Sequence, residues 1–197
     1  ANIIQARLAD RLDVSRASVS EMVKRMETAG LLSMDSSRLQ LTAEGETLAA
    51  RVVRRHRLAE RFLTDVLGLS WSSAHHEACK WEHVITDEVE AGLARLLGNP
   101  STCPHGNPIP GAAPSNTAVV ALDDVPVGSR FTLVRIPEDV EEKDGELASL
   151  EAHQIVPGRS CTLKSRRDGA ASLVVHDATD RDVTLTAFAS ARLLVTL

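Results

Sequence analysis

The chain has 197 residues, 43% of them hydrophobic, a length that allows one large domain or two to three small ones. No apolar run approaches the ~18 residues of a membrane-spanning helix, and no signal peptide is expected at the start. The three cysteines lie far apart, at positions 79, 103 and 161. This spacing argues against a disulfide framework and predicts a protein of the reducing cytoplasm, without a membrane partner.

The formal net charge is −5, but the charge is unevenly distributed. Residues 1–60 carry ten Lys and Arg against eight Asp and Glu, near +2, whereas the remainder is near −7. An acidic body with a mildly basic end is compatible with DNA binding by that end alone, although it does not require it.

Residues 5–32 have the layout of a helix–turn–helix. Val14 is expected to fill the turn, Ser15 to cap the second helix, and Ala29-Gly30 to end it. The residues expected on the buried faces are Leu8, Ala9, Leu12, Val19, Val23 and Met26. Two short alternating segments then flank Asp35-Ser36-Ser37, which predicts a β-hairpin, or wing.

The exposed side of this region is suited to DNA. The candidate DNA-contacting residues are Arg7, Ser15, Arg16, Ala17, Ser18, Glu21, Arg25 and Arg38. Short side chains let a helix approach the major groove, basic groups meet phosphates, and Glu21 could accept from cytosine N4. The order helix, turn, helix, hairpin therefore favours a DNA-binding domain over an ordinary small helical domain.

Three amphipathic helices are expected next. The pattern predicts one long helix from Thr42 to Leu67, a second from Ser72 to about Ile85, and a third over residues 87–97. Helices so apolar on one side, in a chain with only 3% aromatic residues, are expected to pack against a twin. A two-fold homodimer also suits a reader of palindromic DNA.

The run HHEACKWEH in the second of these helices carries four possible metal ligands. His75, Cys79, Glu82 and His83 are spaced by four, three and one residues, which places them within roughly a third of the helix circumference. A thiol, a carboxylate and two imidazoles suit a mid-row divalent ion better than calcium or magnesium. The alternative is that Cys79 is a small buried hydrophobe and the others are solvated surface groups.

A second pair, His56 and Glu60, lies four residues apart on the preceding helix. Alone the pair is a weak signal, because such pairs are common surface contacts. Two helices that each carry a pair could form a second ion site, to which His75 could also belong. His76 could compete with it, since a rotation by one residue changes the facing side chain.

The rest of the chain changes character. Residues 99–117 are rich in proline and glycine and predict a linker or irregular loop; Cys103 and His105 could form half a zinc site there, without a second Cys-x-x-Cys pair. FTLVRI, SCTLKSR, ASLVVH, DVTLTAF and ARLLVTL then predict five short strands, interrupted by one helix over residues 145–152, in a partly open barrel like an SH3 domain. The acidic stretch PEDVEEKDGE reads as a solvated loop, although it could reach across and give a carboxylate to metal.

Three blocks, RRHRLAERFLTDVLGL, HHEACKWEHVITDEVE and HGNPIPG, resemble in order and spacing the diphtheria toxin repressor family of metal-dependent regulators, which includes the iron-dependent regulators. The resemblance covers nearly the whole chain. It implies a multidomain, mainly α protein with a small all-β domain. The implied parts are a winged helix–turn–helix over 1–42, a helical metal-binding and dimerisation domain over 43–98, a linker over 99–117 and an SH3-like domain over 118–197.

The resemblance also implies two metal sites. Cys79, Glu82 and His83 match the primary site, with a Met from a further helix expected before residue 1. His56, Glu60 and His75 match an ancillary site, which the family completes from the SH3-like domain with a Glu and a Gln three residues apart. Here Glu146 matches the Gln, but Lys143 falls where the Glu should be, so Glu142 or Glu141 is the nearest substitute. Arg57 and Asn107 match an anion pocket, where Cys103 replaces a Ser.

The function that the resemblance implies is a repressor that binds palindromic operator DNA as a dimer when loaded with Fe(II) and controls metal-homeostasis genes. The thiolate at Cys79 favours Fe(II) on softness grounds. Ser18-Val19-Ser20-Glu21-Met22 resembles the recognition helix of manganese-sensing relatives, so Mn(II) is the alternative; Zn(II), Co(II) or Ni(II) could substitute in vitro.

Two rival functions are weaker. A metal-dependent hydrolase would need a general base, and Glu77 is the only spare carboxylate near the cluster, so no enzyme is expected. A winged-helix regulator with purely structural metal residues is the other rival, and operator binding with and without a chelator separates it from a sensor.

Overall fold

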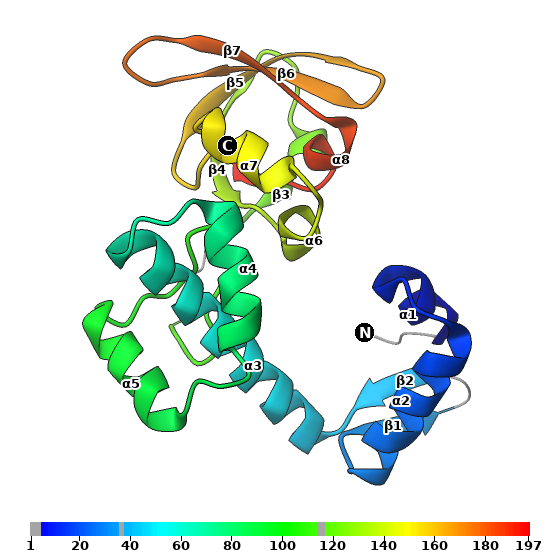
Figure 1. Ribbon diagram of the computed structural model, residues 1–197. Helices are drawn as coiled ribbons and strands as arrows, with labels where there is room; N and C mark the ends of the chain where they lie inside the picture. Colours follow the sequence, from blue (N-terminus) through cyan, green and yellow to red (C-terminus); the bar gives the residue numbers. More distant parts are fainter. Residues whose placement is uncertain (1–4, 36–37, 114–116) are drawn as a thin grey trace. The chain divides into compact units, whose positions relative to one another are not determined.

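The computed structural model describes residues 5–35, 38–113 and 117–197. They form two compact units, residues 1–52 and 53–197, and the boundary falls inside a long helix (Figure 1). Within the described residues, no helix is both long enough and apolar enough to span a membrane.

The first unit is a helix–turn–helix followed by a hairpin, as predicted. Its elements are α1 (Gln5–Leu12), α2 (Arg16–Thr28), β1 (Leu32–Asp35) and β2 (Arg38–Leu41), the strands being antiparallel. Ser15 caps α2 by accepting a hydrogen bond from the Ser18 N–H at 3.1 Å. The tip of the hairpin, residues 36–37, lies outside the described residues.

The core of this unit is smaller than the sequence predicts. Ala9, Val19, Val23 and Leu39 are buried, and Met26 is half-buried. Leu12 was expected on a buried face and Val14 was expected to fill the turn, but they are 50% and 41% exposed. Leu12 is exposed because it lines an open apolar hollow of about 620 Å³, which also includes Met22 and Leu41.

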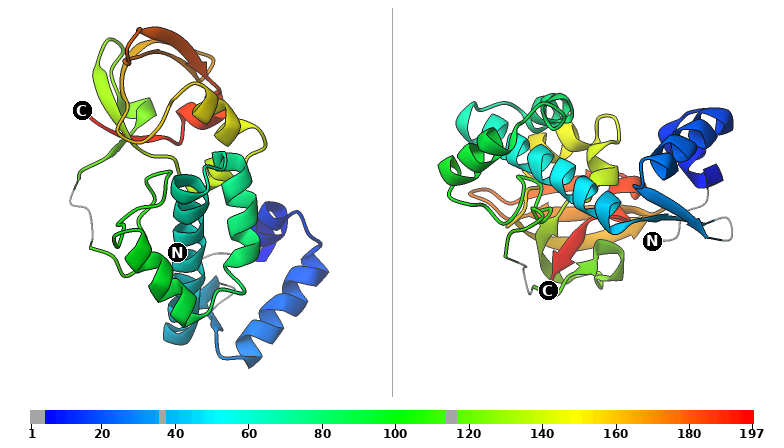
Figure 2. Two further views of the ribbon diagram at one scale, coloured as in Figure 1. Left: turned by 60° about the vertical axis from the view of Figure 1, so that its left-hand side comes forward. Right: turned by 90° about the horizontal axis from the view of Figure 1, so that it is seen from below.

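Three helices begin the second part of the chain. They are α3 (Ala43–Arg61), which continues as a π-helical turn (Phe62–Val66), α4 (Trp71–Trp81) and α5 (Asp87–Leu96). α3 and α5 agree with the prediction. α4 ends at Trp81, four residues before the expected end at Ile85, and Glu82 is its C-cap. The apolar faces of these helices meet in a core of Ala59, Leu63, Ala74, Ala78, Ile85 and Leu93. Figure 2 shows the ribbons of the three helices packed together.

The segment after α5 was expected to be a linker, but residues 101–110 pack along α3. Three arginines of α3, three and four residues apart, donate hydrogen bonds to main-chain carbonyls of this segment. The pairs are Arg54 with Pro110, Arg57 with Pro108, and Arg61 with Thr102. Because these bonds run along one helix face, the segment belongs to the helical body and holds its side chains at fixed positions.

The C-terminal domain contains all five predicted strands and a sixth, too short to predict. The strands are β3 (Val120–Ala121), β4 (Arg130–Arg135), β5 (Ser160–Arg167), β6 (Ala170–Val175), β7 (Arg181–Leu185) and β8 (Leu194–Thr196). They form one antiparallel sheet in the order β3-β8-β4-β5-β6-β7. Alternate residues such as Cys161 and Leu163 on β5 point into the core, so the period-two pattern is confirmed.

Three short α-helices and one 3₁₀ turn (Leu122–Asp124) complete the described part of this domain. The α-helices are α6 (Glu138–Glu141), α7 (Glu146–Ala152) and α8 (Ala187–Ser190). α7 is the helix predicted over residues 145–152. The acidic stretch expected as a solvated loop instead forms α6, and its Val140 and Glu141 are buried. One carboxylate of the acidic stretch is therefore directed into the protein.

Candidate metal centre

α3 supplies the first two side chains of a buried polar centre. His56 and Glu60 are one turn apart and face the same side of the helix. His56 is 6% exposed and Glu60 is fully buried, and Nε2 of His56 lies 3.1 Å from Oε1 of Glu60. A carboxylate without solvent is costly unless it is paired, so the groups around Glu60 decide what this centre can do.

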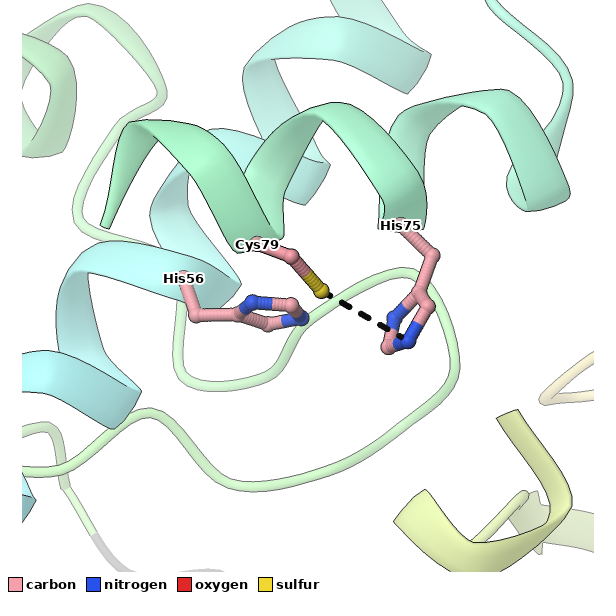
Figure 3. A group of neighbouring side chains, drawn as sticks. All are labelled: His56, His75 and Cys79. Carbon is pink, nitrogen blue, oxygen red and sulfur yellow. Dashed lines mark hydrogen bonds between the residues drawn. The ribbon is translucent and has the colours of Figure 1, made fainter. Parts of the chain in front are cut away.

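α4 adds His75 and Cys79, again one turn apart (Figure 3). His75 Nδ1 is hydrogen-bonded to Oε1 of Glu60 at 3.0 Å and lies 3.5 Å from Oε2 of Glu141. The other ring nitrogen, Nε2, faces Sγ of Cys79 at 4.0 Å. His75 thus lies between two carboxylates and a thiol.

The segment held along α3 adds Cys103 and His105, both buried. His105 Nδ1 lies 3.0 Å from Oε1 of Glu141 and 3.5 Å from Oε1 of Glu60. Gly106 has φ +84°, and a Cβ there would lie 2.1 Å from the carbonyl oxygen of Val134. Only glycine therefore allows this close approach to β4. Cys103 and His105, which the sequence offered as half a zinc site, are grouped with the Glu60 carboxylate and not with a second cysteine pair.

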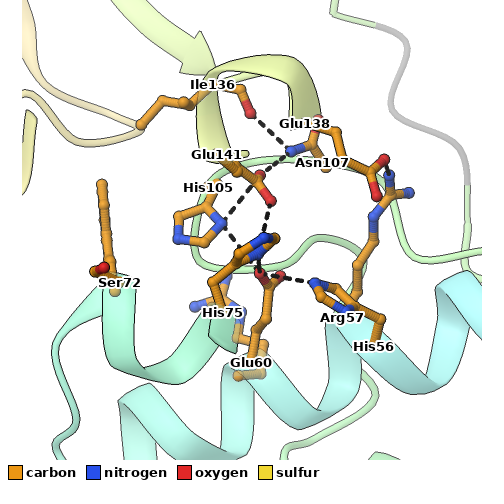
Figure 4. A network of polar contacts seen from close by, with 12 residues as sticks. His56, Arg57, Glu60, Ser72, His75, His105, Asn107, Ile136, Glu138 and Glu141 are labelled. Carbon is orange, nitrogen blue, oxygen red and sulfur yellow. Dashed lines mark hydrogen bonds and ion pairs between the residues drawn. The ribbon is translucent and has the colours of Figure 1, made fainter. Parts of the chain in front are cut away.

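The C-terminal domain contributes Glu141 from α6 (Figure 4). It is 7% exposed, and Asn107 Nδ2 donates to its Oε1 at 2.6 Å. The expected donors were Glu146 and either Glu142 or Glu141. Of these, Glu141 faces the centre, whereas Glu142 is exposed and Glu146 accepts a hydrogen bond from Thr186 Oγ1 at 2.6 Å. The helical turn of α6 directs residue 141 inward, and the next residue points about 100° away.

The two residues expected to line an anion pocket are bonded to protein groups. Arg57 donates to the Pro108 carbonyl, and its Nη2 lies 3.3 Å from Oε2 of Glu138. Asn107 donates to the Ile136 carbonyl at 2.7 Å as well as to Glu141. An anion at this place would have to displace a carbonyl or a carboxylate from these donors.

The structure does not gather Cys79, Glu82 and His83 around one point. Because α4 ends at Trp81, the helical spacing that aligned them is lost after that residue. Glu82 turns to His56, with Oε2 2.7 Å from Nδ1, whereas the His83 side chain is 68% exposed and lies 3.3 Å from Oε1 of Glu82. Cys79 is grouped instead with His56 and His75.

Three overlapping sets of donor atoms emerge, each within 4.8 Å of one another. The sets are His56, His75 and Cys79; His56, Glu60, His75 and Glu141; and Glu60, Cys103 and His105. Among the described residues, the buried Oε2 of Glu60 and Nε2 of His105 have no hydrogen-bond partner. Buried polar atoms are normally paired, so orphaned donors in a mixed N, O and S set fit a mid-row divalent ion.

A small pocket leads to this centre. It has a volume of about 270 Å³. α4 supplies Ser72, His75, His76 and Cys79 to its lining, and the rest, including Glu141, comes from α6, α7 and the turn between them. A hydrated ion could enter by this route.

The free centre balances its charges with protons. Burial alone would lower the pKa of His56, but the Glu60 and Glu82 carboxylates outweigh burial and raise the pKa to about 9. Burial opposes ionisation of Glu60, yet hydrogen bonds with His56 and His75 hold the pKa of Glu60 well below its usual range. Burial, together with the charge of Glu82, raises the pKa of the Cys79 thiol. A divalent cation could take the place of these protons.

All eight candidate DNA-contacting residues are exposed on the first unit. Arg16, Ala17 and Ser18 form the first turn of α2, with Glu21 and Arg25 farther along the same helix. Ser15 uses its hydroxyl as the helix cap, where it accepts a hydrogen bond from the Ser18 N–H.

Comparisons with known proteins agree on one family. The profile "Iron dependent repressor, N-terminal DNA binding domain" matches residues 2–38, and "Iron dependent repressor, metal binding and dimerisation domain" matches residues 42–111. The iron-dependent repressor IdeR of Mycobacterium tuberculosis is 40% identical over 184 residues, covering 87% of this chain and 80% of that protein. The diphtheria toxin repressor of Corynebacterium diphtheriae is 49% identical over 127 residues, 64% of this chain and 52% of that protein. Among solved structures, a manganese-dependent transcriptional repressor in complex with manganese matches all of this chain and 91% of its own, with a TM-score of 0.85 and 30% identity.

Proposed function

Because this chain belongs to the family of iron-dependent repressors that includes the diphtheria toxin repressor, and is a metal-dependent transcriptional repressor, we propose that Fe(II) is the ion that activates it. The protein would act in the cytoplasm. Its DNA target would be a two-fold symmetric operator beside genes of metal homeostasis. The buried donor set of Glu60, His75 and Glu141, with His56, His105 and Cys103 around it, carries the proposal.

The donor chemistry favours Fe(II) over Mn(II). Two thiols, Cys79 and Cys103, belong to the donor sets, and sulfur ligands select softer ions than the carboxylates and water that suit Mn(II). The likeness to a manganese-dependent repressor keeps Mn(II) as the alternative.

Two sites are proposed, in contact with one another. One is the buried centre, for which we choose Glu141 over the alternative Glu142 and leave Glu146 out. The other forms at the end of α4 from Cys79, Glu82 and His83, which lie close in sequence and of which two are already 3.3 Å apart. The 2.7 Å contact between His56 and Glu82 joins the two, so occupancy of one changes the partner available to the other.

A divalent ion would supply positive charge to the carboxylates in place of the proton on His56. His56 and His75 would each turn a neutral ring nitrogen toward the ion. Glu141 would keep its position, because Asn107 already donates a hydrogen bond to it. A ligand shifts the protein toward the DNA-competent state only through its differential affinity for that state, and coupling of about 1–3 kcal/mol is typical.

The dimer contact that such a repressor needs is proposed for exposed apolar residues of the helical domain. Val84 is 74% exposed, and Val89 and Leu96, seven residues apart on α5, are 49% and 65% exposed. Residues seven apart share one face of a helix, so α5 offers an apolar stripe to a second copy.

Operator binding tests the proposal. A symmetric DNA site selected from random duplexes in the presence of Fe(II) would be titrated anaerobically with the protein, with Fe(II), with Mn(II) and with a chelator. We expect tight binding with Fe(II), weaker binding with Mn(II) at equal free ion, and loss of binding with the chelator. Equal affinity with and without chelator would contradict a metal-dependent switch, and a preference for Mn(II) would reverse the choice of ion.

A further inference from the structure

A second set of contacts joins α4 to the C-terminal domain one helical turn away from the metal donors. Trp71, the first residue of α4, is only 7% exposed and belongs to the buried cluster formed by the strands and α7 of that domain. Its ring also stands edge-to-face on His105, with ring centroids 4.8 Å apart. The start of α4 is therefore anchored in the core of the β domain.

Glu151 of α7 holds the backbone at the same place. Both of its carboxylate oxygens accept from the Trp71 N–H, each at 3.1 Å. The first N–H groups of a helix have no acceptor within the helix, and a negative charge there is favoured by the helix dipole. α7, drawn beside the start of α4 in Figure 1, thus caps a helix of the neighbouring domain.

The anchor and the metal donors are rigidly related. Trp71, His75 and Cys79 are spaced by four residues on α4 and lie on one face of it. Glu141, by contrast, lies in α6, a helix of four residues that is too short to hold itself in place. The position of the Glu141 carboxylate therefore depends on how the β domain is held against α4.

We propose that Trp71 and Glu151 are positioning residues of the buried metal centre. They clamp the β domain to α4 before a metal ion arrives, so that Glu141 already faces His75 and Glu60. Neither residue touches the ion. Glu151 acts through Glu141, and Trp71 acts through Glu141 and through His105, against which its ring packs. The inference rests on the proposed function, because it requires that the buried donors bind a divalent ion.

The clamp has a defined effect on affinity. When only a fraction of molecules is competent to bind, the apparent dissociation constant rises by the inverse of that fraction. A docked β domain raises the competent fraction. Loosening the clamp must therefore weaken metal binding while the ligands themselves stay unchanged.

The test measures Co(II) binding by visible absorption in a His83→Ala background, so that the site at the end of α4 gives no signal. Glu151→Ala is expected to weaken binding on the order of tenfold, the worth of a hydrogen bond to a charged group. Glu151→Gln keeps one acceptor oxygen and should restore most of the affinity. Glu88→Ala is the matched control, because it removes an exposed carboxylate from the first turn of another helix, α5, and should change nothing.

A double-mutant cycle separates the clamp from a general loss of stability. In a Glu141→Gln background, Glu151→Ala should change Co(II) affinity by less than about twofold, because the ligand that the clamp delivers is gone. A full tenfold loss that persists in that background would overturn the inference, since Glu151 would then act on α4 itself. If the His83→Ala parent binds Co(II) and the added Glu151→Ala substitution leaves that affinity unchanged, only the clamp is overturned. If the parent does not bind Co(II), the proposed metal centre is overturned as well.

Fluorescence of the metal-free protein gives an independent readout. The chain has two tryptophans, so Trp81→Phe leaves Trp71 as the sole emitter. Its emission should be blue-shifted without metal, and Glu151→Ala should shift it to the red. A red, solvent-like emission of Trp71 in the metal-free Trp81→Phe protein would show that the clamp is open and would overturn the proposal.

Discussion

Replacing Gly106 by Ala is expected to damage the metal centre through the backbone alone. At φ +84° an alanine pays the cost of a left-handed conformation, about 1–2 kcal/mol. Its Cβ would lie 2.1 Å from the Val134 carbonyl oxygen, so the segment must move away from β4. That movement breaks the 2.9 Å hydrogen bond from the Ile136 N–H to the His105 carbonyl, worth about 1 kcal/mol. Together we expect a loss of about 2–3 kcal/mol in the free energy of unfolding.

Gly98→Ala is the matched control. Gly98 has φ +74°, but a Cβ there would meet nothing within 4 Å. This variant has only the conformational cost and should lose about 1–2 kcal/mol, about 1 kcal/mol less than Gly106→Ala. Urea unfolding followed by tryptophan fluorescence reports on the right part of the chain, because Trp71 and Trp81 both lie in the unit of residues 53–197. Equal losses of stability in the two variants would refute the reasoning from the close approach of Gly106 to β4.

Three further outcomes are expected. By calorimetry, Glu141→Gln should weaken Mn(II) binding at the buried centre at least about tenfold, whereas Glu142→Gln should leave the affinity unchanged. The reverse result would assign the ligand to Glu142. The pKa of His56 is raised to about 9, and an ion binds only the neutral imidazole. Mn(II) affinity should therefore rise with pH by roughly tenfold per pH unit for each proton released, and should level off above about pH 9. An affinity that is flat between about pH 6 and about pH 9 would show that no proton leaves. Leu96→Glu should dissociate the dimer in sedimentation experiments, whereas the matched Val127→Glu, at an exposed valine of the C-terminal domain, should not; a dimer that tolerates Leu96→Glu must use another surface.

The sequence was most informative where side-chain spacing alone determines the outcome. The four-residue spacing of His56 and Glu60 placed both on one face of α3. His75 on the next helix could have belonged to either predicted metal site, and in the structure it contacts Glu60, as one of these alternatives required. The strands of the C-terminal domain were readable because their buried residues alternate. In both cases local geometry carries the information, and no distant partner has to be known.

Other parts of the centre depend on contacts that spacing does not reveal. Nothing after Trp81, such as a glycine or proline, marks the end of α4, so the alignment of Cys79 with Glu82 and His83 was extended one turn too far. Glu141 lies in an acidic run whose members look alike until one turn of helix directs a single carboxylate inward.

The segment after α5 illustrates the same limit. Its prolines and glycines are typical of a linker, and only the tertiary structure shows that its carbonyls accept hydrogen bonds from Arg54, Arg57 and Arg61. The sequence signal that could have revealed it is the spacing of these arginines along one face of α3. Cys103 and His105 enter the centre because this segment is held there.

Reciprocal linkage tests the central claim, that metal occupancy and operator binding are coupled. Fe(II) affinity of the protein would be measured anaerobically with and without the selected operator, beside operator affinity with and without Fe(II). Coupling requires that the two ratios be equal, and we expect both to lie between roughly fivefold and 150-fold. An operator that leaves Fe(II) affinity unchanged would contradict the account.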